Sequence, residues 1–381
     1  MKKNQYKIKA EKENELLATL DKRDDVEAAR IKRYLAMPDL SRTASSPINE
    51  IIERIKQVET LKDFDEIETP EIVPTGASFD LFNFPANHPA RSKSDTYFVD
   101  DKNILRTHTT VCWYYYLMSD FGKAKVKNNE PIGVLSYGKV YRKDEIDRNH
   151  MNVFHQIDGW YIIPKEQGVI NLEDLKKVLV EIIQSVFGKD IKYRFNPDTF
   201  PYTDPSLEME ILKNDRWIEV LGCGVIQGGV LEKLGVDSKN YTGWAFGFGL
   251  ERLAIMSMEL PDIRLLWSED PRVTKQLKLG NKFEEVSKYP AVVRDISFIV
   301  PKSFSPNDYF DLVRDTLEDL AEEVELLDKY ENAQKFGEDK ISYAYRITYR
   351  SLDRTLTNAE VDVLHKKLEE TTEKTFAAVI R

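Results

Sequence analysis

Residues 243–253, GWAFGFGLERL, alternate between aromatic and small side chains and then stop alternating. Trp244, Phe246 and Phe248 are interleaved with alanine and glycine, a period of two that is typical of a buried β-strand. The following residues predict a helix with Arg252 in its first turn. A cation beside a helix N-terminus suits a bound polyphosphate. A packed strand–helix corner with a surface arginine fits the same pattern.

A second pattern predicts an antiparallel hairpin about a hundred residues earlier. Residues 133–140 and 152–162 alternate or run apolar, and they frame a charged loop at 141–151. This loop carries another arginine, Arg142.

The remaining pattern of the central part predicts short strands around a few helices. We expect helices at 47–58, 113–118 and 172–187, extended segments at 67–73, 192–195, 206–211 and 217–221, and a glycine-rich turn region at 222–229. Because these strands come from distant parts of the chain, an α+β fold is predicted, an antiparallel sheet flanked by helices over residues 46–284.

The last hundred or so residues have their own order of elements. We expect a strand at 292–300, a helix capped by Ser305, strands at 324–329 and 342–349, a helix with Thr357 and Glu360 as its capping box, and a last strand at 377–381. This βαββαβ order is ferredoxin-like. We place the boundary near 281–288 and the second domain at 288–381. Residues 1–45, highly charged, predict one or two exposed helices or a partly ordered arm.

Composition and charge exclude several classes of protein. The chain has 381 residues, 41% hydrophobic and 31% charged, which is typical of a soluble globular protein, and it contains no apolar run of membrane-spanning length. Its net charge of −10 argues against a protein that coats nucleic acid, although a local basic stripe would still bind phosphates. The widely spaced Cys112 and Cys223 fit a reducing compartment and exclude a cysteine-rich zinc site.

The motifs, taken together, resemble those of one enzyme family. VYRKDE…FHQID (140–158) resembles motif 2 of the class II aminoacyl-tRNA synthetases, and GFGLERLAI (247–255) resembles motif 3. FPANHPAR, LRTHTT, FPYTDPSLEMEI and PDIRLLW narrow the resemblance to phenylalanyl-tRNA synthetase, from about Ser46 to the end of the chain. The ferredoxin-like module resembles the anticodon-binding domain, as in the single-chain organellar type. The helix and strand near 47–73 match motif 1, from which we infer no dimer.

The resemblance implies activation of L-phenylalanine with ATP and its transfer to the 3′-terminal adenosine of tRNA(Phe). Arg142 would bridge the α-phosphate and the amino-acid carboxylate, while Arg252 and Phe154 would hold the two faces of adenine. Mg²⁺ would be bound by Glu219, although this residue equally fits an exposed strand glutamate. The expected ATP site is completed by Asp144, where relatives more often carry Glu, and by His150.

For the amino acid, the resemblance implies an apolar pocket with polar groups at its mouth. Phe200 and Tyr202 would pack on the substrate ring, and Ala245 would form the pocket floor. Tyr202 departs from the usual Phe. The groups expected around the substrate's ammonium and carboxylate are His108, Thr110, Gln156 and Asp158. Since an apolar pocket rejects an added hydroxyl by only about 10²-fold, tyrosine is a competing substrate. We find no segment that would hold an editing domain and expect no post-transfer editing.

The expected tRNA-binding residues of the C-terminal module are Arg346, Arg350, Arg354, Lys366 and Lys367, interleaved in part with tyrosines. The N-terminal arm could also bind tRNA, and ordinary surface charge explains either set. Two alternatives to a monomeric ligase remain, a catalytic subunit that needs a partner and a synthetase-like protein without catalysis. No presequence is recognisable, so we expect a cytosolic protein, with a mature mitochondrial-matrix protein as the alternative.

Overall fold

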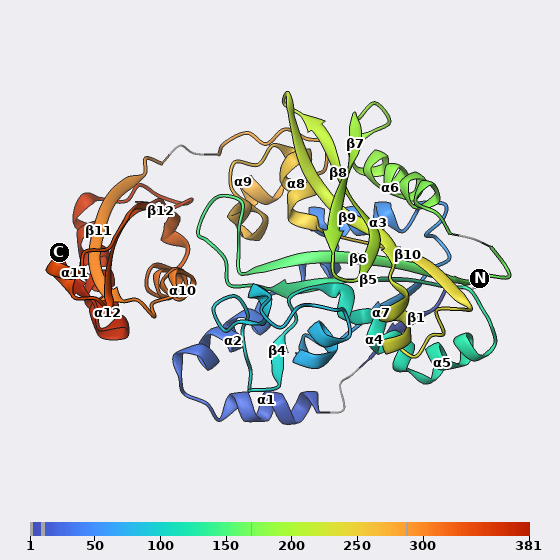
Figure 1. Cartoon of the computed structure of the whole chain (residues 1–381). Coiled ribbons are helices and arrows are strands. Elements are labelled where there is room, and N and C mark those ends of the chain that lie inside the picture. Colours follow the sequence, from blue (N-terminus) through green and yellow to red (C-terminus); the bar gives the residue numbers. More distant parts are fainter. Residues whose placement is uncertain (1–2, 9–11, 169, 287–288) are drawn as a thin grey trace. The chain divides into compact units, whose positions relative to one another are not determined.

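The computed structural model describes residues 3–8, 12–168, 170–286 and 289–381 (Figure 1). Spatially, the chain divides into two compact units. The first comprises Met1–Tyr141, Val153–Leu260 and Leu277–Lys282, and the second comprises Arg142–Asn152, Pro261–Gln276 and Phe283–Arg381. Lys288, where the second domain was expected to begin, lies outside the described residues.

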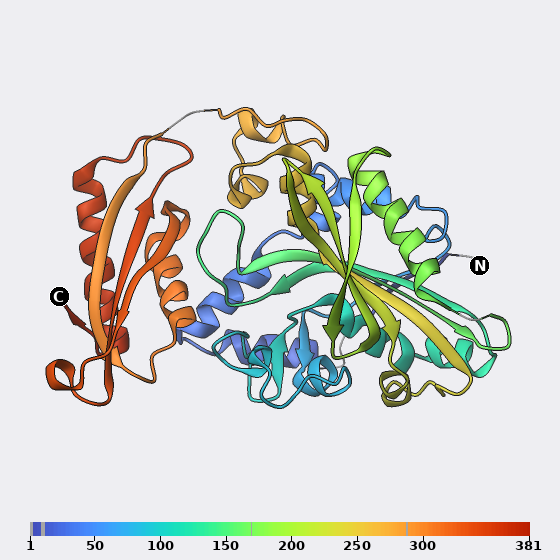
Figure 2. The same cartoon turned by 45° about the horizontal axis from the view of Figure 1, so that its top comes forward.

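The first unit is built on an eight-stranded sheet in the order β1-β2-β5-β6-β10-β9-β8-β7, whose twist is clearest in Figure 2. The strands are β1 (Gln5–Lys7), β2 (Asp65–Glu68), β5 (Ile132–Tyr141), β6 (Val153–Pro164), β7 (Tyr193–Phe200), β8 (Thr203–Lys213), β9 (Arg216–Ile226) and β10 (Tyr241–Gly249). All neighbours from β5 to β7 in this order are antiparallel, as predicted, whereas β1, β2 and β5 run parallel at one edge. A separate two-stranded ribbon consists of β3 (Ile72–Pro74) and β4 (Asn103–Leu105).

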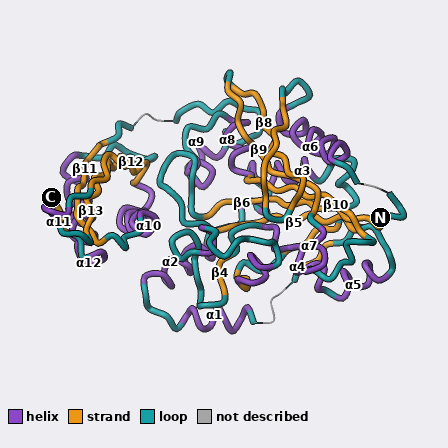
Figure 3. Tube along the Cα trace, in the orientation of Figure 1, coloured by secondary structure: helices purple, strands orange, loops and turns teal. Residues whose placement is uncertain are grey.

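Helices cover both faces of this sheet (Figures 1 and 3). One face carries α3 (Pro47–Ile55), α6 (Leu172–Phe187) and α8 (Leu250–Met258), and the other carries α4 (Cys112–Met118) and α7 (Gly228–Lys233). The unit also contains α1 (Glu13–Asp21), α2 (Val26–Ala36) and α5 (Asp120–Lys127). As predicted from the sequence, the helix that starts at residue 172 ends at Gly188, whose φ of 90° interrupts the helical backbone.

The glycine-rich turn predicted at 222–229 is wrong. Residues up to Ile226 continue β9, and Gly228 begins α7. Gly222 is needed within the strand because a Cβ there would lie 2.5 Å from Cζ of Phe200. Glycine in this stretch therefore serves close packing, which the sequence pattern alone does not distinguish from a turn.

The N-terminal segment is less exposed than expected. β1 was not predicted, and α2 buries Ala28, Arg30, Ile31 and Tyr34. The Lys139 Nζ donates to the carbonyls of Leu35 and Met37, at 2.9 and 2.7 Å. The two expected helices are thus present, and α1 is largely exposed as predicted, whereas α2 is partly buried.

The second unit contains the ferredoxin-like module that the sequence predicts. Its sheet has the order β12-β13-β11-β14, from β11 (Val292–Pro301), β12 (Ala321–Tyr330), β13 (Lys340–Tyr349) and β14 (Val379–Ile380). The α-helices of the second unit are α9 (Pro271–Thr274), which precedes the module, and α10 (Pro306–Leu317), α11 (Ala333–Phe336) and α12 (Asn358–Phe376) within it. The capping box of Thr357 and Glu360 is confirmed, whereas Ser305 occupies the N-cap position without a side-chain cap bond.

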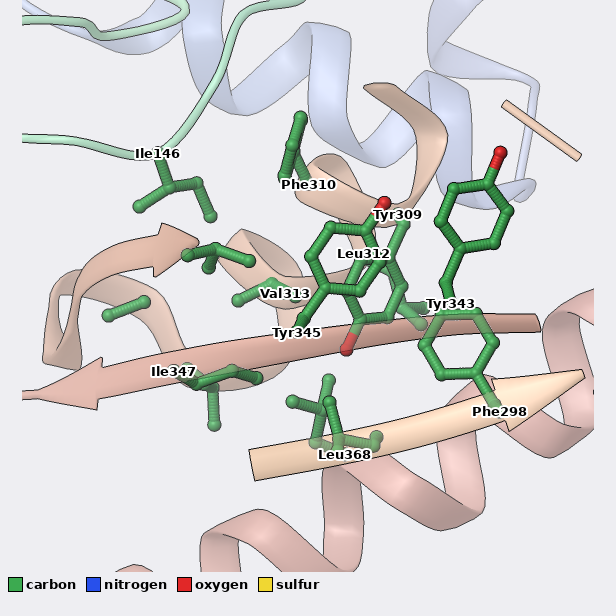
Figure 4. Packing of buried hydrophobic residues seen from close by; sticks show 14 of the residues in the cluster. Ile146, Phe298, Tyr309, Phe310, Leu312, Val313, Tyr343, Tyr345, Ile347 and Leu368 are labelled. Carbon is green, nitrogen blue, oxygen red and sulfur yellow. The ribbon is translucent and has the colours of Figure 1, made fainter. Parts of the chain in front are cut away.

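The core of the second unit is rich in aromatic rings. Figure 4 shows Tyr309, Tyr345 and Phe298 at its centre, and the first two are stacked with centroids 4.9 Å apart. Ile146, from the loop between β5 and β6, belongs to this same core, and its carbonyl accepts the Val324 N–H at 3.0 Å. This loop was expected to be a charged tip, and the burial of Ile146 within it depends on contacts with residues far along the chain.

Candidate active site

A pocket of the first unit opens where β10, β9, β8 and β6 lie side by side. It is lined by Trp113, Asp158, Phe200, Tyr202, Thr203, Gly222, Cys223, Ala245, Phe246 and Gly247. Most of this lining is aromatic or apolar, as is typical of pockets that bind small molecules. Four residues expected to bind the amino acid are therefore brought together: Asp158, Phe200, Tyr202 and Ala245.

The wall of the pocket is aromatic. The rings of Phe200 and Tyr202 are stacked with centroids 6.1 Å apart, and the edge of Tyr202 meets Trp113 at 6.2 Å. Ala245 is 3% exposed and is paired in register with Trp160 and Gly224. A small side chain at this point of β10 leaves the space that a larger residue would fill.

Among the described residues, Asp158 is the only carboxylate that lines this pocket. Its Oδ2 accepts the Thr110 hydroxyl and its Oδ1 accepts the Trp113 Nε1–H, both at 2.8 Å. Burial raises the pKa of Asp158 to about 7, and the two donated hydrogen bonds oppose this rise. The group therefore titrates near neutral pH and could bind a cation in its ionised form.

Two further residues predicted to bind the amino acid are Gln156, on β6, and His108, next to Thr109. The Gln156 side chain accepts the Thr109 N–H at 3.3 Å. The ring of His108 stacks on Phe84, with centroids 5.6 Å apart, and its Nε2 is 3.1 Å from the Ser78 carbonyl. Polar side chains are thus held in place beside the aromatic wall.

Arg252 lies where the sequence predicts it, in the first turn of α8. Its guanidinium donates to the Glu219 carbonyl at 2.9 Å and lies 3.9 Å from the Glu219 carboxylate. Both side chains are about half exposed, so they are accessible to a ligand. Phe154, on the neighbouring part of the sheet, is half-buried.

The carboxylates near Arg252 suit an open magnesium site, shared with a nucleotide, better than a site in which protein side chains supply every ligand. Glu219 is paired in register with Glu210 across β9 and β8. Within the described residues, no group of three or more His, Cys, Asp or Glu side chains could hold a metal ion. Mg²⁺ at a nucleotide needs only one or two carboxylates, because phosphates and water supply its other ligands.

Arg142, Asp144 and His150 all belong to the second unit. The Arg142 N–H donates to the Asn152 carbonyl at 3.0 Å, and the Asp144 carbonyl accepts a bond from Arg314 at 2.7 Å. The His150 ring is 2.9 Å from Asp147. These contacts give the loop a defined conformation within the second unit.

The expected tRNA-binding residues differ in how far they are committed to partners. Arg350 donates to Glu322 at 2.6 Å and to the Tyr289 carbonyl at 2.8 Å. Arg346 binds Asp295 and holds the pKa of that carboxyl below its usual value. Arg354 pairs with Glu360, whereas Lys366 and Lys367 are exposed on α12.

Several residues of the site were not predicted. Trp113, Thr203 and Cys223 line the pocket, and burial raises the pKa of the Cys223 thiol to about 12, so it stays neutral. Thr203 directly follows Tyr202, and Cys223 lies in the glycine-rich stretch that was interpreted as a turn. Had 222–226 been assigned as a strand, its alternation would have placed Cys223 beside the pocket.

Family models match most of the chain. Residues 31–277 match the tRNA synthetases class II core domain (F), and residues 287–381 match the ferredoxin-fold anticodon binding domain. No helix among the described residues has the length and apolar character needed to cross a membrane.

Curated relatives are more than a third identical to this chain over the aligned residues. The mitochondrial phenylalanine–tRNA ligase of Mus musculus is 37% identical over 80% of this chain and 72% of its own length. The chloroplastic/mitochondrial phenylalanine–tRNA ligase of Arabidopsis thaliana is 38% identical over 81% of this chain and 71% of its own length. A phenylalanine–tRNA ligase alpha subunit of Persephonella marina is 34% identical over 72% of this chain and 80% of its own length.

Proposed function

Since this chain belongs to the phenylalanine–tRNA ligase family of class II tRNA synthetases, we propose that it activates L-phenylalanine with ATP and transfers it to tRNA(Phe). The observation that carries the proposal is the pocket that unites Asp158, Phe200, Tyr202 and Ala245. Its aromatic wall and small floor suit a benzyl side chain, and Asp158 suits the substrate's ammonium group.

The first step is the attack of the phenylalanine carboxylate on the α-phosphate of ATP, with pyrophosphate as the leaving group. Negative charge builds up on the phosphate oxygens, so positioned cations are the main catalysts. Arg142 would donate two parallel bonds to the α-phosphate and the carboxylate, because its planar fork spans two oxygens. Arg252 and Phe154 would hold adenine between a guanidinium and an aromatic ring.

Along the chain, each of the two arginines follows a strand of the first unit's sheet. β5 and β10 are both antiparallel to β6, so they run in the same direction. Their carboxyl ends therefore lie at the same end of the strands of this sheet. Arg142 directly follows β5, and Arg252 lies in the helix that follows β10. Asp144 and His150, in the segment after β5, complete the proposed ATP site.

Further residues fit the substrates of both steps. Glu219 would hold a Mg²⁺ ion, which neutralises phosphate charge when bound. His108, Thr110 and Gln156 would orient the amino acid's polar end. In residues 288–381, proposed as the anticodon-binding domain, tRNA would meet Arg346, Arg350, Arg354, Lys366 and Lys367.

We also propose that the protein acts as a monomer in an organelle. The catalytic and anticodon-binding modules lie on one chain, and several relatives are mitochondrial enzymes. The comparisons do not support the expected cytosolic location. The alternative is a catalytic subunit that needs a partner, as the name of the alpha-subunit relative suggests for that protein. An active species well above 44 kDa would favour this alternative.

ATP–pyrophosphate exchange with each of the 20 amino acids tests the proposed function. We expect exchange with phenylalanine, weaker exchange with tyrosine, and none with the others. No exchange with any amino acid would favour a protein without catalysis, and exchange led by another amino acid would refute the assignment.

A further inference from the structure

His155 is fully buried on the face of β6 opposite the proposed ATP site. Its side chain is 0% exposed. Because side chains alternate along a strand, Phe154 and Gln156 point to one face of the sheet and His155 points to the other. The ring of His155 contacts Glu251 of α8, on the face of the sheet that carries this helix.

Two segments far apart in sequence hold the imidazole. The Leu40 N–H donates to its Nε2 at 3.0 Å, and its Nδ1 lies 2.6 Å from the Glu251 carboxylate. Since Nε2 accepts the Leu40 N–H, Nδ1 is the ring nitrogen that donates to Glu251. The His155 backbone N–H also donates to both oxygens of Glu251, at 2.9 Å.

Glu251 directly precedes Arg252 in α8 and is 3% exposed. Successive helical residues point about 100° apart, so Glu251 faces the sheet while Arg252 reaches Glu219. The bonds to His155 therefore fix the rotation of α8 about its axis, and with it the direction of the Arg252 guanidinium.

The N-terminal segment that supplies Leu40 is itself well anchored. Asp39 caps the short 3₁₀ turn Leu40–Arg42 by accepting the Ser41 N–H at 2.9 Å. The Arg42 guanidinium donates to the Tyr137 carbonyl on β5 at 3.0 Å. The Leu40 N–H is thus held at a defined place on the face of the eight-stranded sheet that carries α8.

We propose that His155, held between the Leu40 backbone and Glu251, is a positioning residue for ATP. It keeps Phe154 and Arg252 at the separation that an adenine ring requires. The inference rests on the proposed function, and it gives residues 39–42 a part in nucleotide binding without any contact with the nucleotide.

Leu40→Pro tests this role by deleting one hydrogen-bond donor. Proline is tolerated at the first position of a helical turn, and Asp39, with φ −83° and ψ 99°, is already extended as a residue before proline must be. Leu40→Ala is the matched control, because it truncates the same buried side chain and keeps the N–H. KM and kcat for ATP–pyrophosphate exchange are measured per active site, counted from the adenylate burst.

We expect Leu40→Pro to raise KM for ATP about fivefold over Leu40→Ala, with KM for phenylalanine unchanged within twofold. His155→Asn keeps a donor for Glu251 and loses the Nε2 acceptor, so it should match Leu40→Pro. The double variant should show no further increase, because both changes remove the same bond.

Equal KM values for ATP in Leu40→Pro and Leu40→Ala would overturn the proposal. So would parallel increases in both KM values, which indicate general loosening of the fold. Should Leu40→Pro fail to fold, His155→Asn alone decides between these outcomes. Wild-type protein without exchange activity would instead refute the proposed function.

Discussion

Asp158 combines a buried position with hydrogen bonds that favour its charge. Burial outweighs the bonds from Thr110 and Trp113 and raises its pKa to about 7. A substrate ammonium beside it would favour the ionised form. Phenylalanine binding should therefore require the loss of a proton below pH 7 and not above it.

The pH dependence of KM for phenylalanine checks this claim. Because the carboxyl is neutral below its pKa, we expect KM to be about tenfold higher at pH 6 than at pH 8. Asp158→Asn should have a higher KM that no longer changes with pH in this range. A wild-type KM independent of pH would mean that Asp158 does not face the ammonium group.

Substitution of Arg252 should affect the use of ATP and leave phenylalanine binding nearly unchanged. In Arg252→Lys the charge remains but the planar fork is lost, so kcat/KM for ATP should fall about 10²-fold. KM for phenylalanine should change little. Arg272→Lys, at an exposed arginine paired with Asp270, is the control and should equal wild type. Equal losses in the two variants would contradict a specific role for Arg252.

Among the elements, β6 and β10 show how closely the catalytic strands are packed. Gly159 lies opposite Phe246, and a Cβ at Gly159 would be 2.3 Å from the Phe246 ring. Phe246 therefore requires glycine at the position opposite it on β6.

Gly159→Ala should lower the free energy of unfolding by about 2–3 kcal/mol, because the overpacked ring must move. Gly229→Ala, near the start of α7, has nothing within 4 Å of its new methyl group and should be neutral or stabilise by up to about 1 kcal/mol. Denaturant unfolding of the full-length protein compares the two. Similar stabilities would show that the Phe246 ring yields at little cost.

Local patterns predicted those elements whose periodicity reflects one buried face. The helix from 172 to Gly188, the alternation of β10 and the capping box at Thr357 follow from neighbouring residues alone. The burial of α2 and of Ile146 in the loop after β5 does not, since both depend on partners far along the chain. The pocket residues came from motif resemblance, and Cys223 was missed because glycine in a strand resembles glycine in a turn.

At the scale of the whole molecule, we assign amino-acid activation to the class II core and propose tRNA contacts on the C-terminal module. Lys366→Glu combined with Lys367→Glu should raise KM for tRNA several-fold, because phosphate contacts depend on local positive charge. ATP–pyrophosphate exchange, which needs no tRNA, should be unchanged. Lys302→Glu, in the same module and paired with Glu331 in the native protein, is the control. An unchanged KM for tRNA would remove α12 from the proposed interface.

Charging of a tRNA(Phe) transcript by the purified chain alone tests whether one chain performs both steps of the reaction. We expect labelled phenylalanine to accumulate on the tRNA in the presence of ATP, with an active species of about 44 kDa by gel filtration. A chain that supports pyrophosphate exchange with phenylalanine but leaves tRNA(Phe) uncharged until a second subunit is added would contradict this expectation.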